Sequence, residues 1–122
     1  MRLPTNSPLD KLLDGGLELD AITNVYGPAG SGKTNIALIT SLSCLKDKKV
    51  IYMDTEGSFS LERFRQLGGT EKDLKNIIMV HVHDWKEQND KMHEFESVVE
   101  KEKKIGVIVV DSLVALYRLE LD

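Results

Sequence analysis

The stretch of sequence that decides the fold is Gly27-Pro28-Ala29-Gly30-Ser31-Gly32-Lys33-Thr34. It fits the pattern G-x-x-x-x-G-K-S/T, in which glycines let successive backbone N–H groups point at one phosphate. We expect all eight residues, with Asn35 after them, to bind ATP. The Lys33 ammonium should reach the β- and γ-phosphates and serve catalysis, and the Thr34 hydroxyl should coordinate Mg²⁺. A glycine turn with a purely structural role is the alternative.

Apolar strands alternate with helices on both sides of this loop. Residues 21–26 are expected to form the strand before it, and residues 33–45 the helix after it. Further strands are expected at residues 50–53, 77–82 and 105–110, and helices after Ser7, at residues 61–67, after Thr70 and after Asp84. Strands this apolar, alternating with helices, predict a parallel sheet covered on both faces. The expected fold is therefore α/β, a three-layer parallel-sheet fold of the P-loop type.

Two of the expected helices carry apolar residues at helical spacing. In helix 33–45 the positions expected to be buried are Ile36, Ile39 or Thr40, and Ser43 or Cys44. In the helix after Asp84 they are Trp85, Met92, Phe95 and Val99. The charges between those four residues are expected to form a solvated face and not a binding site.

Composition places the chain among ordinary globular proteins. It has 122 residues, enough for one domain, with 41% hydrophobic and 30% charged residues. The net charge of -4 argues against a general nucleic-acid-binding surface. A single cysteine, Cys44, allows no internal disulfide, and no apolar run approaches the roughly 20 residues of a membrane helix. We expect a cytoplasmic protein without a signal peptide.

Two carboxylates follow expected strands. Asp111 ends the aliphatic run Val107-Ile108-Val109-Val110, and we expect it to hold Mg²⁺ through bound water. Glu56 follows the second strand, and the carboxyl ends of parallel strands share one edge of a sheet. Glu56 could therefore deprotonate the water that attacks the γ-phosphate. The alternatives are a strand-end cap for Asp111 and a surface-loop glutamate for Glu56.

Other reactive residue types fit structural roles better. Cys44 is expected to be a buried, inert thiol. His81, His83 and His93 match no metal-ligand spacing. Trp85 is expected to be a packing anchor.

Three segments together resemble the RecA-family recombinases of archaea and eukaryotes. They are Leu12-Leu13-Asp14-Gly15-Gly16-Leu17-Glu18, Asp54-Thr55-Glu56-Gly57-Ser58-Phe59 and Val110-Asp111-Ser112-Leu113. The resemblance covers nearly the whole chain and is strongest to the RadB-type paralogues, because no helix-hairpin-helix domain precedes the ATPase core and because the chain ends in Tyr117-Arg118-Leu119-Glu120-Leu121. It implies that residues 1–122 form the N-terminal part of a single RecA-like ATPase domain.

The resemblance also implies function. It implies ATP-dependent work in homologous recombination and DNA repair, with DNA and other recombinase or repair proteins as partners. It implies that Arg63 stacks on the adenine, where a guanidinium plane fits well. The alternative for Arg63 is an exposed helix residue paired with Glu62 or a neighbour. The family's DNA-binding loops follow Asp122, so these residues do not themselves argue for DNA binding.

Three functions remain open. The first is a weak or DNA-dependent ATPase. The second is an ATP-binding mediator that regulates a recombinase through protein contacts and barely hydrolyses ATP. The third is a clock-type regulatory ATPase, although such proteins usually carry paired glutamates where this chain has Asp54-Thr55-Glu56-Gly57.

The resemblance further predicts a vacancy in the sheet. In the family, the strand after the Asp111 strand inserts beside the strand that leads into the P-loop. Without it, strands 21–26 and 107–110 would lie roughly 10 Å apart and unpaired. Unpaired backbone groups and open apolar edges are costly, so we expect this chain alone to aggregate and to hydrolyse ATP poorly.

Overall fold

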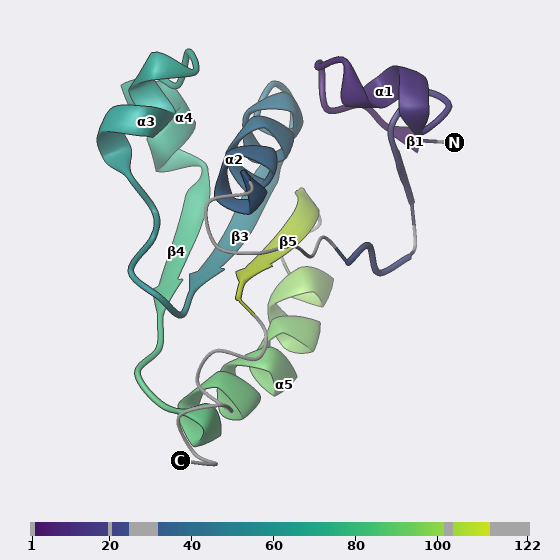
Figure 1. Ribbon diagram of the computed structural model, residues 1–122. Coiled ribbons are helices and arrows are strands. Elements are labelled where there is room, and N and C mark those ends of the chain that lie inside the picture. Colours follow the sequence, from purple (N-terminus) through teal and green to yellow (C-terminus); the bar gives the residue numbers. More distant parts are fainter. Residues whose placement is uncertain (1, 20, 25–31, 102–103, 113–122) are drawn as a thin grey trace.

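The computed structural model describes residues 2–19, 21–24, 32–101 and 104–112 (Figure 1). Its elements in chain order are β1 (Arg2–Leu3), α1 (Leu9–Leu12), β2 (Leu17–Glu18), α2 (Lys33–Cys44), β3 (Lys49–Asp54), α3 (Leu61–Gln66), α4 (Glu71–Lys75), β4 (Ile77–His81), α5 (Trp85–Lys101) and β5 (Ile105–Asp111). Strands 50–53, 77–82 and 105–110 are confirmed to within one residue at each end.

The main sheet is parallel, with β3 between β4 and β5 (Figure 1). Residues 50–53 of β3 are fully buried. Such a continuous apolar run is typical of a strand that is covered on both faces. The register pairs Asp54 of β3 with Asp111 of β5, so both carboxylates reach the same end of the sheet. The α/β class and the parallel sheet are confirmed.

Helices pack on both faces of this sheet. Alternate residues of β3 point to opposite faces, so Val50 and Tyr52 join Leu38 of α2 in one core cluster. Ile51 and Met53 join Phe95 of α5 in the other cluster.

Helix α2 lies close to β5. A Cβ built on Gly106 would lie 2.4 Å from Sγ of Cys44. Glycine at position 106 therefore lets the helix and strand approach. Cys44 itself is buried, and burial raises the pKa of its thiol, as an inert thiol requires.

The buried faces of the two long helices match those expected only in part: Thr40, Cys44 and Phe95 are buried as expected, whereas Ile36 is only half-buried. In α2 the buried residues are Leu38, Thr40, Ser41 and Cys44. In α5 they are Gln88 and Phe95, whereas Met92 and Val99 are exposed. Apolar residues spaced three or four positions apart are compatible with two rotations of the helix about its axis. Packing against the sheet selects one of these rotations.

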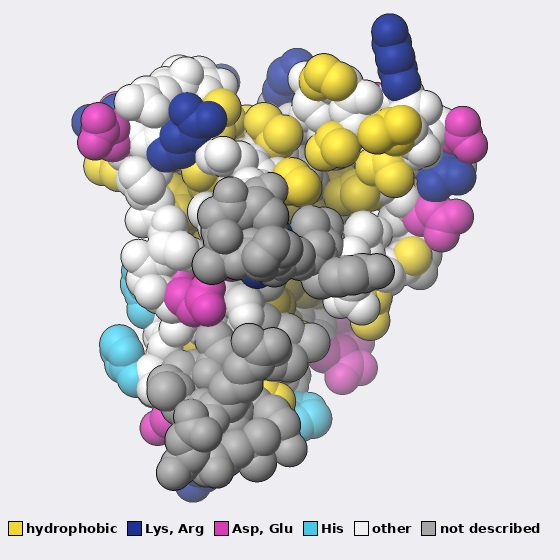
Figure 2. All heavy atoms as spheres, viewed as in Figure 1, with side chains coloured by type: hydrophobic (Ala, Val, Ile, Leu, Met, Phe, Trp, Pro, Cys, Tyr) yellow, Lys and Arg dark blue, Asp and Glu magenta, His cyan; other side chains and the backbone are white. Residues whose placement is uncertain are grey.

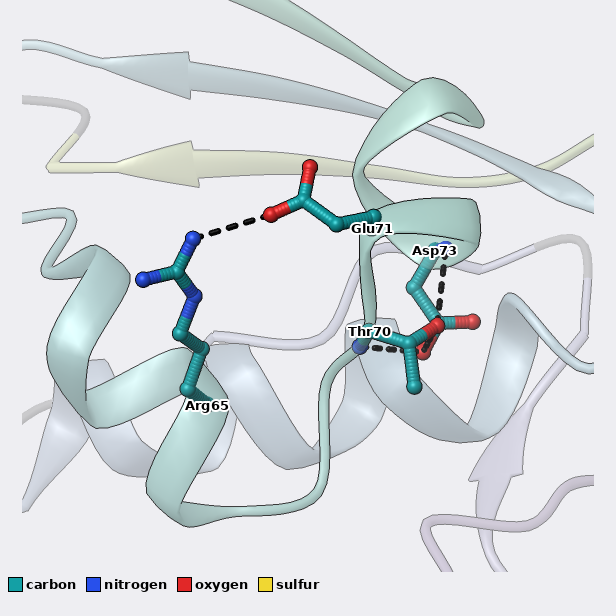
Figure 3. Close-up of polar contacts among 4 residues, drawn as sticks. All are labelled: Arg65, Thr70, Glu71 and Asp73. Carbon is teal, nitrogen blue, oxygen red and sulfur yellow. Dashed lines mark hydrogen bonds and ion pairs between the residues drawn. The ribbon is translucent and has the colours of Figure 1, made fainter.

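Side-chain caps begin α4 and α5 as expected. The Thr70 hydroxyl accepts the Asp73 N–H at 3.2 Å, and the Asp73 carboxylate accepts the Thr70 N–H at 2.9 Å (Figure 3). An exposed Arg65–Glu71 pair at 2.9 Å joins α3 to α4 in the same view. The Asp84 carboxylate accepts the Glu87 N–H at 2.7 Å in front of α5.

The N-terminal residues form a separate small unit in which β1 pairs with β2 in antiparallel register. Helix α1 begins after Ser7 as expected, and Pro8 occupies the position that precedes its first residue, Leu9. The Asp10 carboxylate returns to Thr5, accepting its hydroxyl at 2.7 Å and its N–H at 2.9 Å. These bonds lower the pKa of Asp10.

A hollow of about 310 Å³ lies beside the N-terminal unit and is lined by Thr5, Leu9, Leu13, Leu17, Thr23, Asn24 and Ile36. Hydrophobic side chains gather over the part of the surface where α1 lies in the same view (Figure 2). Leu12 of α1 is 82% exposed, and Ile22 is 92% exposed.

The strand expected at residues 21–26 is wrong over its described part, because residues 21–24 lie in no strand. Val25, Tyr26 and residues 27–31 of the predicted ATP loop lie outside the described residues. The expected vacancy beside β5 therefore stays a prediction. Within the described ranges, no helix is long and apolar enough to cross a membrane.

Candidate functional site

The site forms where β3 and β5 end and α2 begins. Oδ2 of Asp111 accepts hydrogen bonds from three hydroxyls: Thr34 at 3.0 Å, Ser58 at 3.0 Å and Tyr52 at 3.2 Å. These donors come from the first turn of α2, from the loop after β3 and from β3 itself. The structure thus brings together Thr34 and Asp111, the two residues expected to hold Mg²⁺.

Gly32 and Lys33 lie at the start of α2. Gly32 precedes the helix with φ +91°, a left-handed conformation that favours glycine. Lys33 is the first residue of the helix, so its side chain starts at the positive end of the helix dipole. The described part of the predicted ATP loop thus consists of a left-handed glycine followed by the first residues of a helix.

Tyr52 reaches Asp111 from inside the protein. Its side chain is fully buried in the α2-side cluster, and its ring meets Phe59 edge-on at a centroid distance of 5.2 Å. Burial first, and the Asp111 charge second, raise the pKa of Tyr52. The phenol consequently stays protonated and donates to the carboxylate.

Asp54 shapes the loop that carries Glu56. It is buried, and its Oδ1 accepts the N–H groups of Glu56 at 3.2 Å and Ser58 at 3.1 Å. Its Oδ2 accepts the N–H of Phe59 at 3.1 Å. Gly57 completes the turn with φ +68°. One carboxylate thus organises the backbone of the whole loop.

Thr55 joins this loop to the end of β5. Its N–H donates to the Asp111 carbonyl at 2.9 Å. Its hydroxyl donates to the Ser112 carbonyl and accepts the Ser112 N–H, both at 2.7 Å. The loop after β3 and the residues at the end of β5 are therefore held as one piece.

Glu56 lies in this loop, at the sheet edge where it was expected, and it is exposed. Its backbone is fixed by Asp54, while its side chain faces solvent. A water molecule can therefore reach the carboxylate.

Arg63 and Asn35 meet on the surface. The Arg63 Nε donates to Oδ1 of Asn35 at 3.0 Å, and Nη1 donates to Oε1 of Gln66 at 3.3 Å. Both residues were expected to bind the nucleotide, and the structure places them in contact. Within the described residues Arg63 does not pair with Glu62, but it is exposed and its bond to Gln66 of the same helix is a neighbour contact of the kind that the alternative expected.

The donor set fits magnesium. Thr34 and Asp111 offer the hydroxyl and carboxylate oxygens that Mg²⁺ prefers, and Mg²⁺ commonly takes its other ligands from water and phosphate. The Thr34 proton points to Asp111, which leaves the lone pairs of the hydroxyl for a cation. Across the described ranges, no group of three His, Cys, Asp or Glu could hold a metal ion.

Tyr52, Ser58 and Asp54 were not identified as site residues from the sequence. The only local signal is Asp54 at a strand end ahead of a glycine turn, because aspartate side chains often bond backbone N–H groups a few residues on. The contacts of Tyr52 and Ser58 with Asp111 span 59 and 53 positions and depend on the β3–β5 register.

Comparison with known proteins gives consistent matches. The family model described as Rad51 matches residues 1–122. The DNA repair and recombination protein RadB of Methanosphaera stadtmanae is 49% identical over 121 residues, which are 97% of this chain and 52% of that protein. RadB of Archaeoglobus fulgidus is 37% identical over 123 residues, covering 55% of its length.

A solved structure agrees with these relatives. The crystal structure of the RadB recombinase superposes with a TM-score of 0.82 at 40% identity, covering 97% of this chain and 55% of that one. The chain therefore spans about half the length of the relatives it matches.

Proposed function

This chain belongs to the Rad51 family, and from that premise we propose that it binds Mg-ATP where β3 and β5 end and that it acts in homologous recombination and DNA repair. The observation that carries the proposal is the 3.0 Å hydrogen bond between Thr34 and Asp111. It joins the end of a G-x-x-x-x-G-K-S/T pattern to an acid that ends an aliphatic strand.

The chain's own residues account for nucleotide binding. The N–H groups at the start of α2 and the Lys33 ammonium would hold the phosphates. The Thr34 oxygen would bind the metal ion while its hydroxyl still donates a hydrogen bond to Asp111, and the Asp111 carboxylate would accept hydrogen bonds from metal-bound water. Magnesium, when bound, supplies positive charge beside the β- and γ-phosphates. Residues 27–31 are proposed as phosphate ligands from the sequence pattern alone.

Glu56 is proposed as the general base of a slow ATPase. Its exposed carboxylate starts from a loop that Asp54 and Thr55 fix to the sheet edge. A fixed backbone with an accessible carboxylate suits the orientation of a water molecule. Arg63, steadied by Asn35, is proposed to stack on the adenine.

In a second proposal the protein binds ATP but hardly hydrolyses it. The ties from Thr55 to Ser112 and from Ser58 to Asp111 link the proposed metal site to the loop after β3. Nucleotide could therefore act as a conformational ligand of a mediator that contacts a recombinase or other repair proteins. ATP turnover of the full-length protein, with and without single-stranded DNA, separates the two. A clock-type role has no support from the relatives.

DNA as a partner rests on the family alone. On the face in Figure 2, the Lys and Arg side chains of the described residues lie apart from one another, whereas a DNA-binding surface gathers them. A cytoplasmic location likewise stays a prediction.

Calorimetric titration of the full-length protein with ATP and MgCl₂ tests the binding site. Lys33→Ala should weaken binding at least about tenfold, the scale of a hydrogen bond to a charged group. Lys72→Ala removes an exposed lysine from α4 and is the matched control. ATP affinity at the wild-type level in Lys33→Ala would show that this loop does not bind the nucleotide.

A further inference from the structure

Asp111 is bonded by more hydroxyls than the ATP-binding pattern explains. Thr34 belongs to that pattern, but Tyr52 and Ser58 do not. All three hydroxyls reach the same oxygen, Oδ2, at 3.0–3.2 Å. Oδ1 accepts no hydrogen bond from the described part of the chain. The two carboxylate oxygens are therefore in different environments.

The Tyr52 hydroxyl is held in a single position. The ring is fully buried and lies edge-on to Phe59, so the phenol oxygen cannot move without repacking the core. A buried hydroxyl without a partner is costly, and its partner here is Asp111. Phenylalanine would fill the same space without the hydroxyl. The hydroxyl therefore acts on the carboxylate, while the ring packs in the core.

Ser58 reaches Asp111 from the loop after β3. Its N–H is fixed on Oδ1 of Asp54 at 3.1 Å, which aims its hydroxyl at Oδ2 of Asp111. A buried strand residue and a loop residue thus bond one carboxylate oxygen independently. Together with Thr34 they restrict rotation of the Asp111 side chain.

We propose that Tyr52 and Ser58 are positioning residues for Asp111. They hold Oδ2, which leaves Oδ1 to accept a hydrogen bond from water bound to the metal of Mg-ATP. This inference rests on the proposed function, since it concerns the same site. Outer-sphere partners of metal-site carboxylates orient them, and their loss commonly costs about 10- to 100-fold in metal affinity. The effect belongs to magnesium dependence and not to nucleotide binding as such.

The test measures ATP affinity of the full-length protein by calorimetry in EDTA and across a series of MgCl₂ concentrations. Tyr52→Phe should leave the ATP affinity in EDTA within about twofold of the unmodified protein. It should raise about tenfold the MgCl₂ concentration at which half of the magnesium-dependent gain in ATP affinity is reached. Ser58→Ala should raise the same MgCl₂ concentration by a smaller factor. Thr40→Val is the matched control, because it removes a buried hydroxyl that has no hydrogen-bond partner in the described structure.

Each outcome decides the proposal. Wild-type MgCl₂ dependence in folded Tyr52→Phe and Ser58→Ala overturns it, and so does an equal loss of affinity with and without magnesium. If Tyr52→Phe does not fold, Ser58→Ala alone decides by the same criterion. If the unmodified protein binds no ATP, or binds it without any magnesium effect, the proposed function fails and this inference with it. ATP binding that responds to magnesium and to Lys33→Ala, but not to Tyr52→Phe or Ser58→Ala, overturns only the inference.

Discussion

The Thr34 hydroxyl lies 3.0 Å from Oδ2 of Asp111, although 77 positions separate the two residues in the chain. The contact exists because β5 lies beside β3, with Asp111 opposite Asp54, and the first turn of α2 lies at the same end of the sheet. The contact brings the end of the loop pattern and a strand-end acid together as one candidate metal site.

Thr34→Ala should remove most of the gain in ATP affinity that MgCl₂ provides, because it deletes the proposed metal ligand and the hydrogen bond that Asp111 accepts. The loss should be at least the roughly tenfold effect of an outer-sphere partner. Thr34→Ser keeps the hydroxyl and should keep the magnesium effect. Calorimetry with and without MgCl₂ measures both, and an undiminished magnesium effect in Thr34→Ala would remove Thr34 from the site.

Glu56→Gln should separate binding from chemistry, because glutamine keeps the shape and loses the base. ATP affinity should stay within a few-fold, while phosphate release by the full-length protein should fall roughly a hundredfold. Glu62→Gln, at an exposed position of α3, is the control. Equal phosphate release from Glu56→Gln and the unmodified protein would return Glu56 to the role of a surface-loop glutamate.

Arg63→Ala should weaken ATP binding roughly two- to fivefold, the size of an exposed cation–π contact. Tripolyphosphate has no base to stack on, so its affinity should not change. Arg65→Ala removes a neighbouring exposed arginine that pairs with Glu71 and should change neither affinity. A parallel loss for ATP and tripolyphosphate would mean that Arg63 acts on the phosphates.

Gly106→Ala should lower the free energy of unfolding by about 1–3 kcal/mol, because the new methyl group would overlap Sγ of Cys44. Urea denaturation measures the change. Combining it with Cys44→Ala makes room, so the double variant should lose less than the sum of the two single losses. Strictly additive losses would show that α2 and β5 do not meet at this point.

The elements that could be predicted from sequence are those with a local cause. Capping pairs at Thr70 and Asp84 and the apolar run of β3 act over a few residues, and the structure has them where expected. Residues 21–24 look equally strand-like, but a strand exists only through its partner, and local sequence does not reveal whether a partner lies beside it.

The residues of the candidate site also fall into those that local sequence predicts and those that depend on the assembled sheet. Lys33 and Thr34 come from one pattern, and Asp111 from its place after an aliphatic run. The contacts of Tyr52 and Ser58 follow from the pairing of Asp54 with Asp111, and a shift of one residue would send Tyr52 to the other face of the sheet. Register depends on how the whole sheet assembles, so these contacts were visible only in three dimensions.

The three backbone N–H groups that Asp54 accepts should make the loop after β3 open slowly. The N–H groups of Glu56, Ser58 and Phe59 all end on one carboxylate, and that of Thr55 ends on the Asp111 carbonyl. Amide protons held this way exchange with solvent only when the hydrogen bonds break. Although Glu56 is exposed, these amides should exchange as slowly as those of a short helix, and Asp54→Ala should speed their exchange together.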